Sequence, residues 1–376
     1  MKQLNHRHPF KVNKKLVGIE KKYEEIESLK NIGSNDVRTL GLWGMGGIGK
    51  TTLAKSLYAK HCSQFEYHCF LKNVREVSTK CGLKAVRYKL YSTLLKLGPD
   101  APYVETTILK RRLERAKCFI VLDDVATLEQ AEYFNIGLGP GSRVIVTTRD
   151  KQIFSQFDEC EIYEVGGLNR VDSLQLFCWN AFRKKHAEVG YEELSESAVG
   201  YCRGNPLALK VLGVNLRTKS QETWESELEK IKEIPDARIL EVLKLSFIDL
   251  DRTQQDIFLD IACFFNPKLN KFAGYNTREY IIDLFNACEF YPATGIEVLL
   301  HKALIAFRHE KGRPFPTIKM HDLLVEMGRE IVKEKYPKNP GSRSRLWDPK
   351  EIYQVFKYNK VSGRLNYLYM KMHVYI

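Results

Sequence analysis

The glycine-rich segment Gly44–Thr51, with the sequence GMGGIGKT, constrains the fold of this chain more than any other feature. It matches the pattern G-x-x-x-x-G-K-[ST], whose glycines let consecutive backbone amides point at one anion. An apolar run ends at Trp43 and a helical pattern begins at Lys50. This context predicts a strand, a phosphate-binding loop and a helix in that order, and argues against an ordinary glycine turn. The predicted phosphate-contacting residues are Gly44, Met45, Gly46, Gly47, Ile48, Gly49, Lys50, Thr51 and Thr52.

Two side chains of this segment predict a nucleotide together with a metal ion. Lys50 places a positive charge near the β- and γ-phosphates, and the Thr51 hydroxyl is positioned to ligate magnesium. The helix that begins here also presents the positive end of its dipole to the phosphates. We therefore expect the cofactors to be ADP or ATP and Mg²⁺.

A second apolar run, Cys118–Leu122, ends in two carboxylates, Asp123 and Asp124. A run that is apolar throughout predicts a strand buried on both faces. Ligand sites of parallel sheets form at the carboxyl ends of their strands. We expect Asp123 to ligate Mg²⁺ and Asp124 to orient or deprotonate the attacking water. Capping of a helix is the alternative role for this pair.

The segment Thr147-Thr148-Arg149 ends the next predicted strand. Parallel strands bring their carboxyl ends to one edge of the sheet, so Arg149 is expected near the phosphates. A guanidinium there would respond to the presence of a γ-phosphate. A surface salt bridge is the alternative interpretation of Arg149.

The order of apolar runs predicts an α/β domain in the first half of the chain. Short apolar runs alternate with helical patterns, which is typical of a parallel sheet covered by helices. The predicted strands are Thr39–Trp43, His68–Leu71, Cys118–Leu122 and Val144–Thr148. From Asn169 onward apolar residues recur at helical spacing, with further helices at Ile239–Leu250, Gln254–Phe265 and Met320–Glu334 and a hairpin or wing at Gly312–Ile318.

The composition is that of a folded protein with a surplus of basic residues. Of its 376 residues, 44% are hydrophobic, and the formal net charge is +13. The basic residues are spread along the chain, so we expect solvated linkers and helix faces and regard a nucleic-acid partner as unsupported. The apolar runs are too short to cross a bilayer and no secretory signal is visible. We expect a cytoplasmic or nucleo-cytoplasmic protein without a membrane span.

Taken in order, these motifs resemble the NB-ARC nucleotide-binding module of plant disease-resistance proteins, in the class that carries an N-terminal TIR domain. The resemblance runs from about Leu16 to Trp347. The further segments that carry it are LVGIE from Leu16, FLKNVRE from Phe70, Gly141–Asp150, GNPLAL from Gly204, FLDIACFF from Phe258 and MHD from Met320.

The resemblance implies a division of the chain into parts. It implies a P-loop NTPase domain with a parallel sheet over residues 16–165, a helical subdomain over 166–235 and a winged-helix subdomain over 236–336. Residues 1–15 are expected to be a basic linker remnant, and residues 337–376 a C-terminal linker or tail.

The resemblance also implies roles for single residues and for the whole module. Val17 would approach the adenine, Pro206 would pack against the base, and His321 would contact the β-phosphate of ADP. The module would be a switch in defence signalling, with an ADP-bound off state and an ATP-bound on state. It would be at most a slow Mg²⁺-dependent ATPase, and its ATP state would self-associate or pair with other immune receptors.

Several features depart from this family. Ala126 replaces an acid, and Asn205 replaces a leucine in the GLPL-type motif. A TIR domain upstream and leucine-rich repeats downstream are not found, and residues 363–376 have no counterpart. Two other function classes stay open. They are a nucleic-acid-stimulated P-loop ATPase, suggested by the net charge, and a truncated adaptor that binds partners without nucleotide.

Overall fold

The computed structural model describes residues 16–26, 35–97, 106–265, 277–287, 291–309 and 315–358. The expectations for residues 1–15 and 363–376 lie outside these ranges. The chain divides into two compact units. The first contains Ile48–Leu176 and the described residues up to Gly44, and the second contains Met45–Gly47 and the described residues from Phe177 onward. The segment Met45–Gly47 is called the loop tip below.

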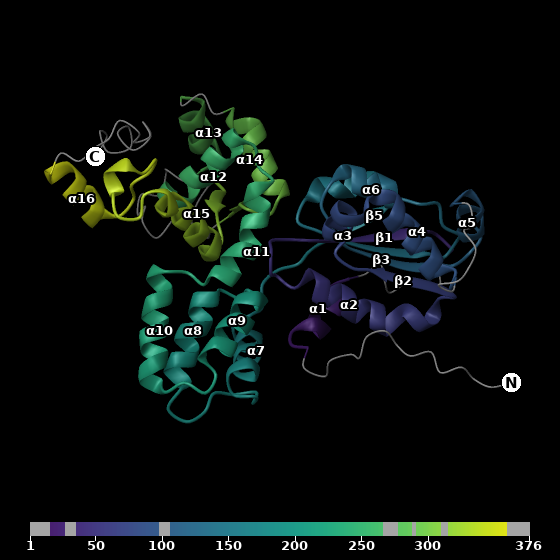
Figure 1. Ribbon diagram of the computed structural model, residues 1–376, viewed down its shortest axis with the longest axis horizontal. Helices are drawn as coiled ribbons and strands as arrows, with labels where there is room; N and C mark the ends of the chain where they lie inside the picture. The colour runs from purple at the N-terminus through teal and green to yellow at the C-terminus, as the bar shows by residue number, and fades with distance from the viewer. Residues whose placement is uncertain are drawn as a thin grey trace. The chain divides into compact units, whose positions relative to one another are not determined.

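The first unit is built on a five-stranded parallel sheet, which confirms the predicted α/β fold class (Figure 1). Its strand order is β2-β3-β4-β1-β5. The strands are β1 (Arg38–Trp43), β2 (Tyr67–Leu71), β3 (Cys118–Val125), β4 (Arg143–Thr148) and β5 (Cys160–Glu164). The four predicted strands are all present, whereas β5 was not predicted. It pairs with β1 at one edge of the sheet, and most of its side chains are exposed, so its sequence CEIYE lacks an apolar run.

Helices cover both faces of this sheet. The helix after the phosphate loop, α2, covers one face, while α3, α4 and α6 cover the other (Figure 1). The bounds in this unit are α1 (Ile19–Glu25), α2 (Lys50–His61), η2 (Cys62–Gln64), α3 (Val74–Cys81), α4 (Leu83–Leu94), α5 (Thr106–Leu113), α6 (Leu128–Phe134) and η3 (Lys151–Gln156). Helix α7 (Arg170–Ala181) begins in the first unit and ends in the second.

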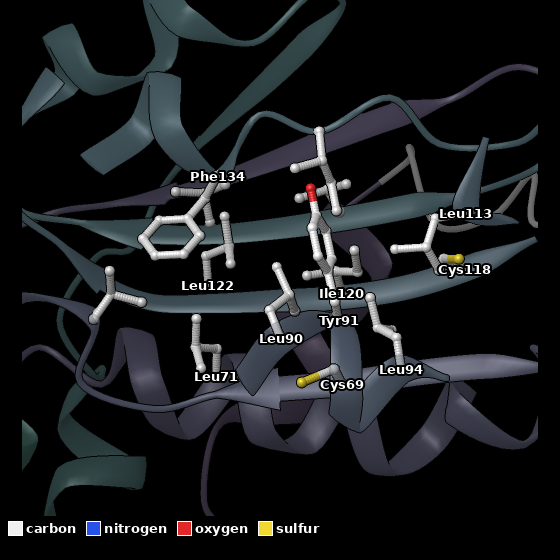
Figure 2. Close-up of a cluster of buried hydrophobic side chains, with 14 of the residues drawn as sticks. Cys69, Leu71, Leu90, Tyr91, Leu94, Leu113, Cys118, Ile120, Leu122 and Phe134 are labelled. Carbon is white, nitrogen blue, oxygen red and sulfur yellow. The ribbon is translucent and has the colours of Figure 1, made fainter. Parts of the chain in front are cut away.

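The core of the first unit lies between α4 and the β2–β3 pair. Figure 2 shows Leu90 and Leu94 of α4 facing Ile120 and Leu122 of β3. All four side chains are buried. Burial of a leucine or isoleucine side chain stabilises the fold by about 1.5–3 kcal/mol. This packing holds the carboxyl end of β3, where the predicted acidic residues lie, in a rigid position.

The second unit is helical, with a small two-stranded sheet. Its helices are α8 (Glu192–Cys202), α9 (Pro206–Leu216), α10 (Gln221–Glu233), α11 (Ala237–Ile248), α12 (Arg252–Phe264), α13 (Arg278–Asn286), α14 (Pro292–His301), α15 (Asp322–Lys335), η4 (Pro340–Ser342) and α16 (Pro349–Lys357). The strands β6 (Ala306–Arg308) and β7 (Thr317–Lys319) pair antiparallel. The hairpin or wing predicted at Gly312–Ile318 overlaps only β7, and its first residues, 312–314, lie outside the described residues. Within the described residues, no helix is both long and apolar enough to cross a membrane.

One buried ion pair ties the segment after α15 to α12. The guanidinium of Arg345 donates from Nε to Asp260 Oδ1 and contacts Asp256 Oδ1 at 2.9 Å. The side chains of Arg345 and Asp260 are 2% and 0% exposed. A carboxylate this far from water needs a partner. The pair therefore fixes the path of the chain between α15 and α16.

We expect Arg345→Met to destabilise this region by about 3–5 kcal/mol, because it leaves the Asp260 carboxylate buried without its cation. The protection of the α12 amides against hydrogen exchange measures this loss of local stability. The double variant Arg345→Met/Asp260→Leu should recover much of the protection, since it removes both charges. A double variant that exchanges as fast as Arg345→Met would contradict this explanation.

Candidate functional site

The phosphate loop connects β1 to α2 through glycines in conformations that other residues rarely adopt. Gly47 has a φ of 76° and Gly49 a φ of 104°. A Cβ at Gly47 would also lie 2.8 Å from the Cβ of Leu207. Both positions therefore require glycine, although of the two the pattern G-x-x-x-x-G-K-[ST] specifies only Gly49.

Lys50 is the first residue of α2 and lies buried beneath this loop. Its Nζ donates to the Gly44 carbonyl at 2.6 Å. Burial, together with smaller repulsion from Arg149 and Arg75, lowers the pKa of Lys50 to about 7, although Asp124 and Asp123 act in the opposite direction. An ammonium in this position is stabilised by any anion that enters the loop.

Asp123 and Thr51 meet, although 72 positions separate them in the sequence. The Thr51 hydroxyl donates to Asp123 Oδ1 at 2.7 Å, and Asp123 is 1% exposed. A hydroxyl and a carboxylate are the oxygen ligands that Mg²⁺ prefers, so this pair fits the predicted metal. Its role as a metal ligand set stays a prediction.

Thr147 of β4 joins the two aspartates and was not among the predicted residues. Its hydroxyl donates to Asp123 Oδ1 and accepts from the backbone N–H of Asp124, both at 2.9 Å. Asp124 has a φ of 60°, which is rare for a residue other than glycine. The β3–β4 register also shifts between Leu122 and Val125. Thr147 therefore stabilises the unusual backbone conformation that positions the Asp124 carboxylate.

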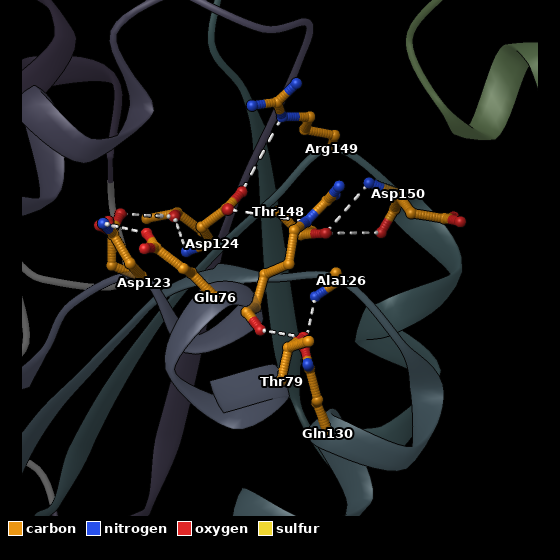
Figure 3. Close-up of polar contacts among 12 residues, drawn as sticks. Glu76, Thr79, Asp123, Asp124, Ala126, Gln130, Thr148, Arg149 and Asp150 are labelled. Atoms are coloured by element: carbon orange, nitrogen blue, oxygen red, sulfur yellow. Dashed lines mark hydrogen bonds and ion pairs between the residues drawn. The ribbon is translucent and has the colours of Figure 1, made fainter. Parts of the chain in front are cut away.

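The Asp124 carboxylate lies between two arginines. Its Oδ1 is 3.8 Å from Arg149 Nε, and its Oδ2 is 3.7 Å from Arg75 Nε. Figure 3 shows Arg149 extending toward Asp124 at the carboxyl ends of the strands. Arg149 thus lies beside the predicted acids. Arg75, on α3, was not a predicted site residue, and a cation soon after a parallel strand is the only sequence signal for it.

Val17 lies two residues before the start of α1 and is half-buried. The next residue, Gly18, has a φ of 70°, and a Cβ there would come within 2.8 Å of Leu168. Lys22 of α1 donates to the Gly166 carbonyl at 2.8 Å. These contacts fasten α1 to the segment after β5. The predicted role of Val17 at the adenine stays a prediction.

Pro206 is the first residue of α9, in the second unit. The preceding Asn205 caps this helix, because its Oδ1 accepts from the N–H of Leu207 at 3.0 Å. Asn205 Nδ2 also donates to the Gly46 carbonyl of the loop tip at 3.3 Å, and Leu207 N–H donates to the Gly47 carbonyl at 3.2 Å. The loop tip belongs to the same unit, so the start of α9 and the loop tip form one local structure.

His321 caps α15 in the second unit. Its Nδ1 accepts from the Leu323 N–H at 3.2 Å, and its Nε2 lies 3.2 Å from the Arg203 carbonyl. Because Nδ1 accepts, the proton of the neutral ring is on Nε2, which donates to Arg203. Burial lowers the pKa of His321. A contact of His321 with a nucleotide stays a prediction.

Comparisons with known proteins agree with this arrangement. Residues 19–187 match the family model described as the NB-ARC domain, and residues 251–336 match that of the Roq1-like disease resistance protein winged-helix domain. Disease resistance protein RUN1 of Vitis rotundifolia is 41% identical over 89% of this chain and 24% of its own length. TMV resistance protein N of Nicotiana glutinosa is 36% identical over 92% of this chain and 30% of its own length. The chain thus spans less than a third of the length of these relatives.

The lowered pKa of Lys50, about 7, predicts a pH-dependent affinity for ADP. A polyphosphate favours the charged ammonium, so binding above pH 7 must take up a proton. We expect the dissociation constant to rise about tenfold per pH unit between pH 7 and 9. Calorimetry in two buffers with different ionisation enthalpies measures the proton uptake. An affinity that stays constant over this range would show that Lys50 is already charged in the free protein.

Proposed function

This chain belongs to the NB-ARC family of plant disease-resistance proteins, and we propose that it is an ADP/ATP switch of an intracellular immune receptor. The NB-ARC domain makes it a nucleotide-binding module. The observation that supports a nucleotide site most directly is the buried Lys50 below a glycine loop, next to the Thr51–Asp123 pair. A site with these groups binds a polyphosphate and a divalent cation.

The residues at and around the phosphate loop have the following proposed roles. The backbone amides of the loop and the ammonium of Lys50 bind the β-phosphate, while Thr51 and Asp123 hold Mg²⁺. The ion would screen the negative charge between the β- and γ-phosphates. Asp124 orients the water that attacks the γ-phosphate. Slow hydrolysis would reset the switch.

The second unit supplies the proposed contacts that distinguish the two states. Pro206 would pack against the base and His321 would donate to the β-phosphate of ADP, keeping the module closed. Exchange for ATP would release this contact and expose a surface for self-association or for pairing with other immune receptors. We also propose the TIR class of these receptors, which the segments FLKNVRE from Phe70 and FLDIACFF from Phe258 resemble. We place it in the cytoplasm.

The energy available from His321 is limited. Moving a switch from nearly all closed to nearly all open needs about 5.5 kcal/mol of differential binding. A charge-assisted hydrogen bond contributes about 1.5–3 kcal/mol, and a neutral one less. In addition, His321 must give up its bond to the Arg203 carbonyl before it can bind a phosphate. His321 therefore biases the switch, and other contacts must supply the rest.

The first test is to identify the nucleotide that co-purifies with the chain. We expect ADP in the wild-type protein and a loss of at least about a hundredfold in ADP affinity in Lys50→Ala, since the variant lacks the buried cation. Lys80→Ala is the matched control, because Lys80 is exposed and pairs with Glu76 on α3. Wild-type affinity in Lys50→Ala would refute the site. Turnover stimulated by nucleic acid, or partner binding independent of Lys50, would favour one of the two other function classes.

The second test concerns His321. We expect His321→Ala to speed ADP dissociation by about 10–100-fold, the size of one charge-assisted contact, without abolishing nucleotide binding. Stopped-flow displacement of a fluorescent ADP analogue measures the rate. His321→Asn is the control for helix capping, because asparagine caps helices well but lacks the ring. Fast dissociation in the alanine variant alone would assign the effect to the cap of α15 and contradict a phosphate contact.

A further inference from the structure

The parallel sheet brings Arg75 to the same edge as the predicted phosphate site. β2 ends at Leu71, and α3 begins at Val74, so Arg75 lies in the first turn of that helix. β2 pairs in parallel with β3, whose carboxyl end carries Asp123 and Asp124. Carboxyl ends of neighbouring parallel strands meet at one edge, where ligands bind. Arg75 therefore reaches the site from the strand farthest from the phosphate loop.

Arg75 and Arg149 approach one carboxylate from two elements. Arg75 Nε is 3.7 Å from Asp124 Oδ2, and Arg149 Nε is 3.8 Å from Asp124 Oδ1. The side chains of Arg75, Arg149 and Asp124 are 21%, 12% and 28% exposed. These three side chains are therefore partly shielded from solvent but still accessible to a ligand. Figure 3 shows the Arg149–Asp124 contact at this edge.

The site contains more cationic than anionic side chains. The cations are Lys50, Arg75 and Arg149, and the anions are Asp123 and Asp124. Repulsion from Arg149 and Arg75 reaches Lys50, so the three cations share one electrostatic environment. Arginine presents donors in a planar fork that matches phosphate oxygens. Two arginines already placed around a carboxylate can also surround a terminal phosphate, which carries more negative charge.

We propose that Arg75 is a second arginine, with Arg149, for the terminal phosphate of a nucleoside triphosphate, and that Asp124 holds both arginines until this phosphate binds. The inference rests on the proposed nucleotide function of the site. It makes Arg75 a residue that selects triphosphate over diphosphate. The loop would contact the phosphates that both nucleotides share, whereas the two arginines would contact only the terminal phosphate of a triphosphate.

The test compares affinities for ADP and for a non-hydrolysable ATP analogue, with Mg²⁺, on the full chain by calorimetry. We expect Arg75→Gln to lower the affinity for the analogue by about tenfold or more, which corresponds to about 1.4 kcal/mol. The affinity for ADP should fall by less than about threefold. Arg75→Lys should restore part of the loss because it keeps the charge. Lys80→Gln, which removes one positive charge from the same helix, should change neither affinity.

The proposed holding role of Asp124 is tested in the same assay. Asp124→Asn weakens the hold on both arginines, so we expect tighter binding of the analogue, and this gain should shrink when Arg75→Gln is added. Equal losses for both nucleotides in Arg75→Gln, or no loss at all, would overturn the inference while leaving the nucleotide site intact. Weaker analogue binding in Asp124→Asn would overturn the holding role. A wild-type chain that binds neither nucleotide would overturn the proposed function as well.

Discussion

A single buried carboxylate organises the candidate site. Asp123 accepts hydrogen bonds on one oxygen from Thr51, at the start of α2, and from Thr147, in β4. An unpaired carboxylate in this position would be strongly destabilising, so the fold and the proposed metal site depend on the same hydroxyl groups. Thr147 extends the constraint, because it also accepts from the N–H of Asp124 and supports its rare backbone conformation. Hydroxyl groups thus align β3, β4 and α2 with respect to one another.

The charges around this carboxylate explain how a site with several cations is stable before a ligand arrives. Burial lowers the pKa of Lys50 to about 7, so the site sheds part of its positive charge. Asp124 lies between Arg75 and Arg149 and offsets much of their repulsion. A phosphate would favour the ammonium form of Lys50 and offer the arginines a stronger partner than one carboxylate. Binding would therefore change both the protonation and the pairing of groups already in place.

Residues of the second unit that the family resemblance assigns to the nucleotide also determine helix ends. His321 caps α15 and binds the Arg203 carbonyl, and Pro206 begins α9. Asn205 departs from the family pattern for a physical reason. Its side chain caps α9 and also donates to the Gly46 carbonyl of the loop tip, which a leucine could not do. Effects of substitutions at these positions therefore combine capping with any contact to a nucleotide.

The sequence by itself determined the phosphate loop, strands β1 to β4, the helical second half and the family. Each of these is encoded in a local pattern of glycines, apolar runs or helical spacing. Strand β5 was missed because an exposed edge strand needs no apolar run. Only the tertiary structure shows that Arg75 and Thr147 contact Asp124. They meet Asp124 because parallel pairing of β2, β3 and β4 brings distant carboxyl ends to one edge, and no local pattern encodes which side chains converge there.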